Sequence, residues 1–341
     1  MSLRVASIYH VAAHARVSTA TVSRALSGTN GSVSPATRER VMRAVELLGY
    51  TPNAAAQNLR TRRSGKVLVT VPDISNPFFS LILQGIEEAA LRAGYAVLIG
   101  DTQHDAAREE RYAQMLRQKE ADGLIFLGHR LPKGAASIVK AAEGRQAPVV
   151  NGCEFSPALG VPSVHIDNEK AALEAMAYLY GLGHRSVAVI TGPLISPLSR
   201  DRLRGTMAGA RAAGAKEHLT VLHGDFSIAS GKAAAVRVLS RTRPPTAIFC
   251  FNDEMAMGCM DAARAAGLRI PADLSVVGFD DIRFSRYLEP PLTTITQPMQ
   301  EIGAGCVRLL LDILRGNPLA PVSITLPHRL TVRGSMAPPR R

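Results

Sequence analysis

Short apolar runs alternate with helix-like segments along most of the chain after residue 66, and this alternation constrains the fold more than any other feature. Near-continuous apolar strands separated by helices are typical of parallel sheets covered on both faces. The alternation therefore predicts an α/β body built from two doubly wound parallel sheets. The runs are VLVTV (67–71), YAVLIG (95–100), GLIFLG, APVVN, SVAVITG, TVLHGD, TAIFCF and LSVVGFD.

Positive charge is concentrated at the N-terminal end of the chain. The formal net charge of the 341 residues is +12. Residues 1–66 hold ten basic and two acidic side chains, a net charge of +8, which leaves +4 for the other 275 residues. A basic module beside a nearly neutral body is the charge layout of a nucleic-acid binder, although a merely solvated basic face would give the same count.

The basic module reads as three short helices. Ser7, Ser18 and Ser34 stand where each helix would begin, and Gly49 where the third would end. The turn between the first two helices spans only residues 15–17, which favours a helix-turn-helix arrangement. The second helix of such a module enters the major groove of DNA, so its side chains are the candidate base and phosphate contacts.

Hydroxyl side chains crowd the second helix, in VSTATVSRALSG. Val22 and Leu26 share one face, which we expect to point inward, and Thr19, Ala20, Ser23 and Arg24 lie on the other side. Hydroxyls near a helix N-terminus suit phosphate oxygens, and arginine suits the O6 and N7 atoms of guanine.

The segment TPNAAAQNLRTRRSG (51–65) has two interpretations. It is a basic linker, or it folds into a helix only on DNA, with Leu59 as an apolar wedge in the minor groove. Its helix-like part is too short to be stable alone in water.

The chain carries a long ordered series of motifs: YHVAAHARVSTATVSRALSG, VSPATRERVMRAVELLGYTPNAAAQNLRTRRSG, VPDISNPFF, ADGLIFLG, VHIDN, GHRSVAVITGP, FNDEMAMG, LSVVGFDDI, PPLTTITQP and TVRGS. Together they closely resemble the lactose-repressor family of bacterial transcription regulators, whose body has a periplasmic-binding-protein fold, and the likeness covers nearly the whole chain. Arg16 departs from the family pattern, which often has glycine or asparagine in that turn. Four further stretches, VLIGDTQHDAAREE, LGHRLP, NGCEFSPALGVPSVHIDN and AYLYGLGH, look most like the cytidine-repressor branch, which responds to nucleosides.

The resemblance implies a domain organisation and a set of DNA contacts. A helix-turn-helix domain would span 1–51, a hinge helix and linker 52–65, and an effector-binding and dimerisation domain 66–337. The latter would divide into an N-subdomain, about 66–166 plus 296–322, and a C-subdomain, about 167–295 plus 323–337. The implied DNA-binding residues are Ser18, Thr19, Ala20, Thr21, Ser23, Arg24, Asn53, Ala56 and Leu59, acting in a homodimer on a palindromic double-stranded operator.

The ends of the strands are where a small-molecule effector is expected. In open α/β sheets, ligands bind beyond the carboxyl ends of the strands. The resemblance implies an effector site made of Phe78, Phe79, Arg202, Phe226, Asn252 and Asp280. It implies structural roles for Asp167 and Asp253 at helix starts, and Gly152 lies near a position where several relatives carry an aspartate. The effector class stays open between a nucleoside, a sugar and a purine base.

Other functions find little support in the sequence. It has no nucleophile elbow, zinc-protease motif or dinucleotide-binding glycine pattern, so no catalytic residues are predicted. The four cysteines are irregularly spaced and the histidines scattered, so neither a metal nor a cofactor is expected. No apolar run is long enough to span a bilayer, and we expect a cytoplasmic bacterial protein that is nucleoid-associated when bound to DNA. The remaining alternatives are a nucleoside- or sugar-binding protein without a DNA role, or a nucleoside-processing enzyme.

Overall fold

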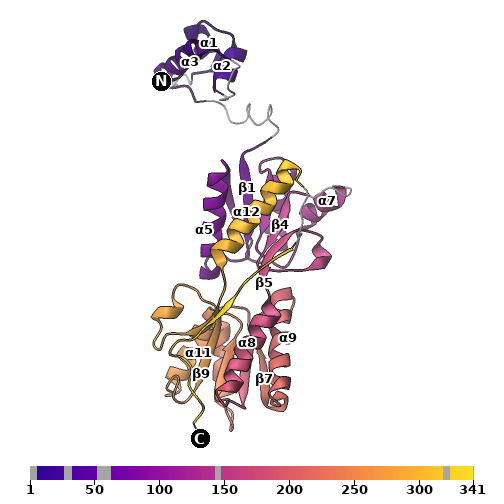
Figure 1. Cartoon of the computed structure of the whole chain (residues 1–341), viewed down its shortest axis with the longest axis vertical. Coiled ribbons are helices and arrows are strands. Elements are labelled where there is room, and N and C mark those ends of the chain that lie inside the picture. The colour runs from indigo at the N-terminus through magenta and orange to yellow at the C-terminus, as the bar shows by residue number, and fades with distance from the viewer. Residues whose placement is uncertain (1–5, 27–32, 52–62, 143–146, 318–322, 341) are drawn as a thin grey trace. The chain divides into compact units, whose positions relative to one another are not determined.

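The computed structural model describes residues 6–26, 33–51, 63–142, 147–317 and 323–340. The chain forms two compact units, Met1–Ser64 and Gly65–Arg341 (Figure 1). No helix within the described ranges is both long enough and apolar enough to cross a membrane.

The described residues of the first unit form three helices: α1 (Ile8–Ala15), α2 (Thr19–Leu26) and α3 (Pro35–Leu48). They enclose a small core in which Val22, predicted to face inward, is fully buried, while Leu26 packs at its margin. The buried members of this core are Val11, Ala12, Ala15, Val22, Ala25, Val41 and Ala44. The predicted helix-turn-helix arrangement is confirmed.

Ser18, Ser34 and Gly49 form the predicted helix caps, whereas Ser7 makes no side-chain cap hydrogen bond and its amide donates to His10 Nδ1 at 3.1 Å. Ser18 accepts a hydrogen bond from the Thr21 amide at 3.2 Å, and Ser34 accepts one from the Thr37 amide at 3.4 Å. Gly49 ends α3 in the left-handed conformation (φ 57°), which glycine adopts without strain.

The second unit, called the body here, contains two six-stranded sheets. The first has the strand order β11-β5-β4-β3-β1-β2 and is parallel throughout. Its strands are β1 (Lys66–Val71), β2 (Ala96–Asp101), β3 (Gly123–Phe126), β4 (Val149–Gly152), β5 (Ser163–Ile166) and β11 (Ser323–Leu326).

The second sheet has the order β12-β10-β9-β8-β6-β7, and all its pairs are parallel except β10 with β12. Its strands are β6 (Val187–Thr191), β7 (Leu219–His223), β8 (Ala247–Cys250), β9 (Ser275–Asp280), β10 (Thr293–Thr296) and β12 (Arg329–Thr331). The prediction of two doubly wound parallel sheets is therefore confirmed.

Helices cover both sheets. In the N-subdomain, which contains the first sheet, α5 (Pro77–Arg92) and α12 (Met299–Arg315) lie side by side (Figure 1). Helices α6 (Ala106–Arg117) and α7 (Lys133–Ala141) of the same subdomain pack against each other. In the C-subdomain, which contains the second sheet, α8 (Asn168–Gly181) pairs with α9 (Pro197–Ala212), and α10 (Ile228–Leu239) pairs with α11 (Asp253–Ala265). Short 3₁₀ turns, η1 (Pro157–Leu159), η2 (Lys216–His218) and η3 (Ser285–Tyr287), complete the body.

The chain passes between the two subdomains at three places: from β5 to α8, from β10 to α12, and from β11 to β12. The last crossing corrects one expected boundary. A division after residue 322 would put β11 in the C-subdomain, but Ser323–Leu326 pairs with β5 in the first sheet. The chain therefore crosses only after β11. The other proposed boundaries stay predictions.

Candidate functional site

The predicted DNA-contacting residues of the first unit lie on α2 and at its start. Ser18, Ala20 and Arg24 are exposed, while Thr19, Thr21 and Ser23 are half-buried. The hydroxyl groups of Ser18 and Thr21 are 2.9 Å apart, and Arg24 Nε donates to the Ala20 carbonyl at 3.3 Å. The Arg24 side chain therefore lies along α2, toward the preceding turn of the helix. Asn53, Ala56 and Leu59 lie outside the described residues.

Arg16, which departs from the family pattern, occupies the turn between α1 and α2 in the left-handed conformation (φ 51°, ψ 51°). Its amide donates to the Ala13 carbonyl at 3.2 Å, and the Val17 amide donates to the Ala12 carbonyl at 3.0 Å. Asparagine and glycine are the residues that tolerate this conformation best. Arg16 therefore preserves the turn while carrying some backbone strain.

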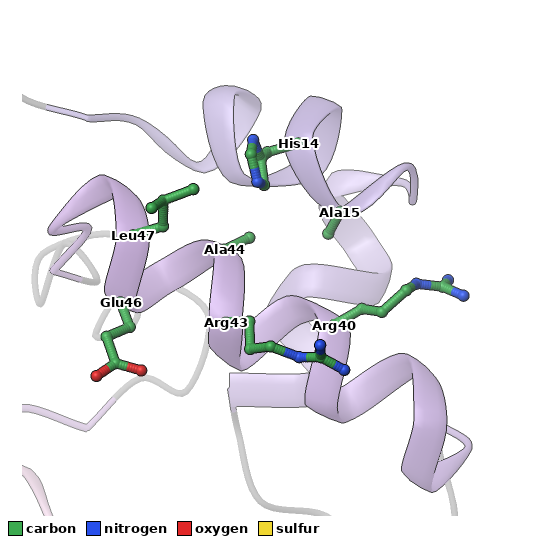
Figure 2. A pocket seen from close by; sticks show the side chains of 7 residues that line it. All are labelled: His14, Ala15, Arg40, Arg43, Ala44, Glu46 and Leu47. Atoms are coloured by element: carbon green, nitrogen blue, oxygen red, sulfur yellow. The ribbon is translucent and has the colours of Figure 1, made fainter.

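An open hollow of about 630 Å³ lies between α1 and α3. Figure 2 shows its lining: His14 and Ala15 come from α1, and the rest comes from α3, namely Arg40, Arg43, Ala44, Glu46 and Leu47. Ala15, Ala44 and Leu47 provide its apolar part, and the charged side chains of Arg40, Arg43 and Glu46 also line it (Figure 2). Small-molecule sites enclose most of the ligand surface, and this hollow is open, so we assign it no effector.

In the body, Arg202 and Asp280 are brought together as the sequence predicts. Arg202 lies on α9 and Asp280 at the end of β9, and Arg202 Nη2 is 3.7 Å from Asp280 Oδ1. Both side chains are buried. Arg202 also donates through Nε to Asn168 Oδ1 at 2.9 Å and through Nη1 to the Phe251 carbonyl. Its guanidinium lies 3.5 Å from the centroid of the Phe279 ring, a cation–π contact.

Burial dominates the electrostatics of this pair. Burial lowers the pKa of Arg202 to about 10, although Asp280 and Glu154 oppose the change. Burial also raises the pKa of Asp280 well above its usual range, against the attraction of Arg202 and a 2.7 Å hydrogen bond from Gln297 Nε2. Burial thus outweighs their mutual attraction. The backbone of Asp280 is unusual as well (φ 113°), and such conformations concentrate at functional sites.

Glu154 is a site residue that the sequence interpretation missed. It follows β4, at the carboxyl edge of the first sheet, and is only 6% exposed. Its carboxylate accepts a hydrogen bond from Ser196 Oγ at 3.1 Å. Burial raises the pKa of Glu154 to about 7, while Ser196 and Arg202 oppose the rise. Its place three residues after Asn151, at a strand end, is the signal that could have identified it.

Gly152 lies two residues before Glu154, near the position where the resemblance implies an aspartate in several relatives. A side chain at Gly152 would meet Leu127 Cδ2 at 2.5 Å and Cys306 Sγ at 3.1 Å. The space beside Gly152 is thus filled by apolar and thiol groups. The buried carboxylate of this strand end comes from Glu154 instead.

Phe226 and Asn252 form a second pair on the C-subdomain. Asn252 Nδ2 donates to the Phe226 carbonyl at 2.8 Å, and its Oδ1 accepts from the Met255 amide at 3.0 Å, which caps α11. Phe226 has a left-handed backbone (φ 75°), and its ring covers Gly192, where any Cβ would lie 2.0 Å from Phe226 Cζ. Asn252 thus fixes the backbone that presents the Phe226 ring.

The two aromatic residues of the N-subdomain differ in exposure. Phe78 is 7% exposed and belongs to the main core, whereas Phe79 is only partly buried. Their rings meet edge to face with centroids 5.2 Å apart. Asn76 caps α5 by accepting from the Phe78 amide at 2.9 Å. Phe79 is therefore the better placed of the two rings to reach a ligand.

Asp167 and Asp253 have the structural roles expected of them. Asp167 caps α8, accepting from the Lys170 amide at 2.9 Å. Asp253 is fully buried and accepts hydrogen bonds from Ile282, Ser285 and Thr294. Within the described part of the chain, no group of three His, Cys, Asp or Glu side chains is arranged to hold a metal ion.

Family models match both the N-terminal helical segment and a large part of the body. Residues 7–53 match the family described as bacterial regulatory proteins, lacI family, and residues 176–336 match the periplasmic binding protein-like domain. Over 331 residues the chain is 42% identical to the HTH-type transcriptional repressor CytR of Escherichia coli (strain K12), covering 97% of this chain and 96% of that protein. It is 36% identical to the HTH-type transcriptional regulator DegA of Bacillus subtilis (strain 168), covering 97% and 98%.

A solved structure is similar over the whole length. The lac repressor dimer bound to operator and the anti-inducer ONPF superposes with a TM-score of 0.86 at 30% sequence identity. The match covers 98% of this chain and 100% of that one.

Proposed function

The chain belongs to the lacI family of bacterial regulatory proteins, and on this premise we propose a repressor that binds a palindromic operator as a homodimer under the control of a nucleoside. It is a DNA-binding transcriptional regulator with a ligand-binding body, as its relatives are, and not an enzyme. We place it in the cytoplasm and, when bound to DNA, at the nucleoid.

The observation that carries the nucleoside proposal is the buried pair of Arg202 and Asp280 at the end of β9. A guanidinium and a carboxylate together offer both donors and acceptors to ribose hydroxyls. Phe79 and Phe226 supply rings on which a base can stack. The resemblance to the cytidine-repressor branch favours the same ligand class over a sugar or a purine base.

The DNA-binding proposal rests on α2. Its exposed residues Ser18, Ala20 and Arg24, with the half-buried Thr19, Thr21 and Ser23, form the surface expected to enter the major groove. We assign base contacts to Thr19, Ala20 and Arg24 and phosphate contacts to Thr21 and Ser23. Asn53, Ala56 and Leu59 of the proposed hinge would follow into the minor groove.

Exposed apolar side chains support the homodimer. Ile99 on the edge strand β2 is 49% exposed, and Leu91 on α5 is 67% exposed. On the second sheet, the edge strand β7 carries Val221, 36% exposed, and α10 carries Val236, 53% exposed. Uncovered edge strands with apolar side chains favour pairing with another chain. A two-fold dimer would place two α2 helices on the two halves of an inverted repeat.

Effector and operator would then be coupled through the body. A nucleoside that draws the subdomains together would change the geometry of the hinges that lead to the DNA-binding units. Because both ligands bias one equilibrium, each would change the affinity for the other by the same factor. Operator affinity measured with and without the effector decides whether the effector strengthens or weakens operator binding.

The test has two arms on the full chain. A thermal-shift screen would compare cytidine, uridine, adenosine and guanosine with their free bases, with ribose and with other sugars. A ligand that binds only the folded protein stabilises it by about 2.7 kcal/mol at one hundred times its Kd. Fluorescence anisotropy with an inverted-repeat DNA, with and without the best ligand, would then measure the coupling.

A nucleoside that raises the Tm and changes operator affinity supports the proposal. A Tm increase with a sugar or free base alone would replace the nucleoside by that class. Equal affinity for the inverted repeat and for random DNA would overturn the operator proposal.

A further inference from the structure

Glu154 connects the two subdomains of the body. It belongs to the N-subdomain, directly after β4, whereas its hydrogen-bond partner Ser196 stands at the start of α9 in the C-subdomain. The Leu198 amide, in the first turn of α9, also lies close enough to the Glu154 carboxylate to lower its pKa. One buried carboxylate therefore faces two polar groups at the start of a helix in the other subdomain.

The start of α9 lacks a cap of its own. Ser196 occupies the N-cap position, but its side chain accepts no capping hydrogen bond, and its hydroxyl donates to Glu154. Helix N-termini leave several amides unsatisfied and favour negative charge. Glu154 supplies both an acceptor and that charge from outside the helix.

Arg202 depends on the same helix. Ser196, Ser199 and Arg202 follow one another at three-residue intervals and are all buried, so they share one face of α9 and its N-cap. A shift at the start of α9 would therefore move the Arg202 guanidinium relative to its partners Asn168 and Asp280.

We propose that Glu154 is a positioning residue, which caps α9 across the subdomain boundary and so holds Arg202 in the effector site. The role of Arg202 rests on the proposed function. The capping contact itself is testable without any effector.

The surroundings of Glu154 give the contact a pH dependence. The charged and titratable groups that act on it are Arg200 and Arg202 on α9 and the neighbouring thiol of Cys153. Asp280 on β9 and Cys306 on α12 act in turn on Cys153. Burial is the largest influence and raises the pKa of Glu154 to about 7, whereas its ordinary value is 4.5. If the subdomains separate, the carboxyl meets water and returns toward that ordinary value. The joined state therefore binds a proton more tightly, and it gains population as the pH falls from 8 to 6.

The experiment measures the distance between the subdomains in the full chain. Spin labels on Lys140→Cys in α7 and Arg211→Cys in α9 report it by pulsed electron paramagnetic resonance. Both positions are exposed and the four native cysteines are buried, so labelling is selective. An excess of unlabelled chain restricts the signal to pairs within one chain. Spectra at pH 6 and pH 8 are compared for the otherwise unchanged chain, Glu154→Gln, Glu154→Ala and Ser196→Ala.

The chain with Glu154 intact should show more of the short distance at pH 6 than at pH 8. Glu154→Gln keeps an acceptor but cannot ionise, so it should show the short distance equally at both pH values. Glu154→Ala and Ser196→Ala should both show longer distances. Effector affinity should fall roughly tenfold in Glu154→Ala, the loss expected for a hydrogen bond to a charged group, and largely recover in Glu154→Gln.

Distance distributions in Glu154→Ala and Ser196→Ala that match those of the intact chain at both pH values would overturn the proposal. A pH response that survives in Glu154→Gln would overturn its assignment to Glu154. If Glu154→Ala fails to fold, Ser196→Ala decides the same question from the other side of the contact. If no nucleoside binds the unsubstituted chain, the proposed effector fails while the distances still decide the role of Glu154.

Discussion

Arg202 Nη2 and Asp280 Oδ1 lie 3.7 Å apart in a buried ion pair, yet both side chains make shorter hydrogen bonds with other residues. Arg202 is held by Asn168 at 2.9 Å, and Asp280 by Gln297 at 2.7 Å. The two charges compensate each other while their positions are set by neutral amides. In the proposed effector site, a ligand hydroxyl would then engage both groups without breaking the contacts that orient them.

Removing one member of this pair should cost more than removing both. Asp280→Asn leaves a buried guanidinium without its counter-charge, which typically costs about 3–5 kcal/mol. We expect a lower free energy of unfolding and loss of the effector response in Asp280→Asn. The double variant Asp280→Asn with Arg202→Met should be more stable than Asp280→Asn alone. Urea denaturation of both variants and of Arg202→Met measures the coupling.

The matched control for that cycle is Asp261→Asn. Asp261 pairs with Lys232 at 2.7 Å, but both side chains are half exposed. Exposed pairs contribute little to stability, so its unfolding should be nearly unchanged. Additive effects of the two substitutions at Arg202 and Asp280 would contradict the interpretation of these residues as an interacting pair.

Arg24→Ala should weaken operator binding selectively. If Arg24 reads a guanine, its loss should cost about 1–3 kcal/mol and relax the preference at one base pair. Anisotropy titrations against operators substituted one base pair at a time would locate that position. Arg43→Ala is the control, because Arg43 lies on α3 and pairs with Glu39 at 3.2 Å. Unaltered discrimination by Arg24→Ala across all positions would refute the base contact.

Arg16→Gly should stabilise the helix-turn-helix unit. Arg16 adopts φ 51° and ψ 51°, a conformation that costs a side-chain-bearing residue about 1–2 kcal/mol and glycine nothing. Amide hydrogen exchange of residues 8–26 in the full chain should become slower. Arg40→Gly is the opposite control, since Arg40 lies inside α3 and glycine there should destabilise the helix by about 1 kcal/mol. Faster exchange in Arg16→Gly would show that the turn carries no strain.

Gly85→Ala should disturb the contact between α5 and α12. A Cβ at Gly85 would lie 2.1 Å from the Gln300 carbonyl oxygen, and one at Gly303 would lie 2.2 Å from that of Ile82. The helices thus approach through paired glycines, and the overpacking should cost about 1–3 kcal/mol in urea denaturation. Gly181→Ala, at the end of α8 with nothing within 4 Å, should be neutral or slightly stabilising. Equal stability of the two variants would argue against the close approach.

Asp253 should make stability depend on pH. Burial raises its pKa to about 6, against hydrogen bonds from Ser285, Thr294 and Ile282. Between about pH 4 and pH 6 the native state holds a proton that the unfolded state has released, so the contribution of Asp253 to stability falls as the pH rises through that window. Asp253→Asn cannot titrate. Its Tm deficit relative to the unsubstituted chain should therefore shrink from pH 4.5 to pH 7, and a constant deficit would contradict the raised pKa.

The sequence predicted the elements whose pattern is local. Runs such as VLVTV and TAIFCF were recognisable as buried strands because nearly every residue in them is apolar. The strands β5 (SVHI), β10 (TTIT), β11 (SITL) and β12 (RLT) were not predicted as strands. They are short and rich in hydroxyl or charged side chains, and they lie next to the subdomain crossings. Their pairing depends on partners far away in the sequence.

The same limit applies to the site. Arg202 and Asp280 were named through the resemblance to the family, and Asp280 also stands at the end of an apolar strand run. Glu154 follows a strand end, but it was missed because its contact with Ser196 at the start of α9 joins residues of different subdomains, which a local pattern does not show. The residue contacts proposed for effector and DNA remain predictions for the experiments above.

The late position of β11 and β12 has a consequence for how the protein is made. Strand β11 completes an edge of the first sheet and β12 completes an edge of the second, yet both come from residues 323–331. During synthesis neither sheet can close until almost the whole chain has left the ribosome, whereas α1, α2 and α3 are complete within the first 48 residues. Domains fold as units while the chain is synthesised. The nascent protein therefore has the helices of its DNA-binding unit long before it has a body that can respond to an effector.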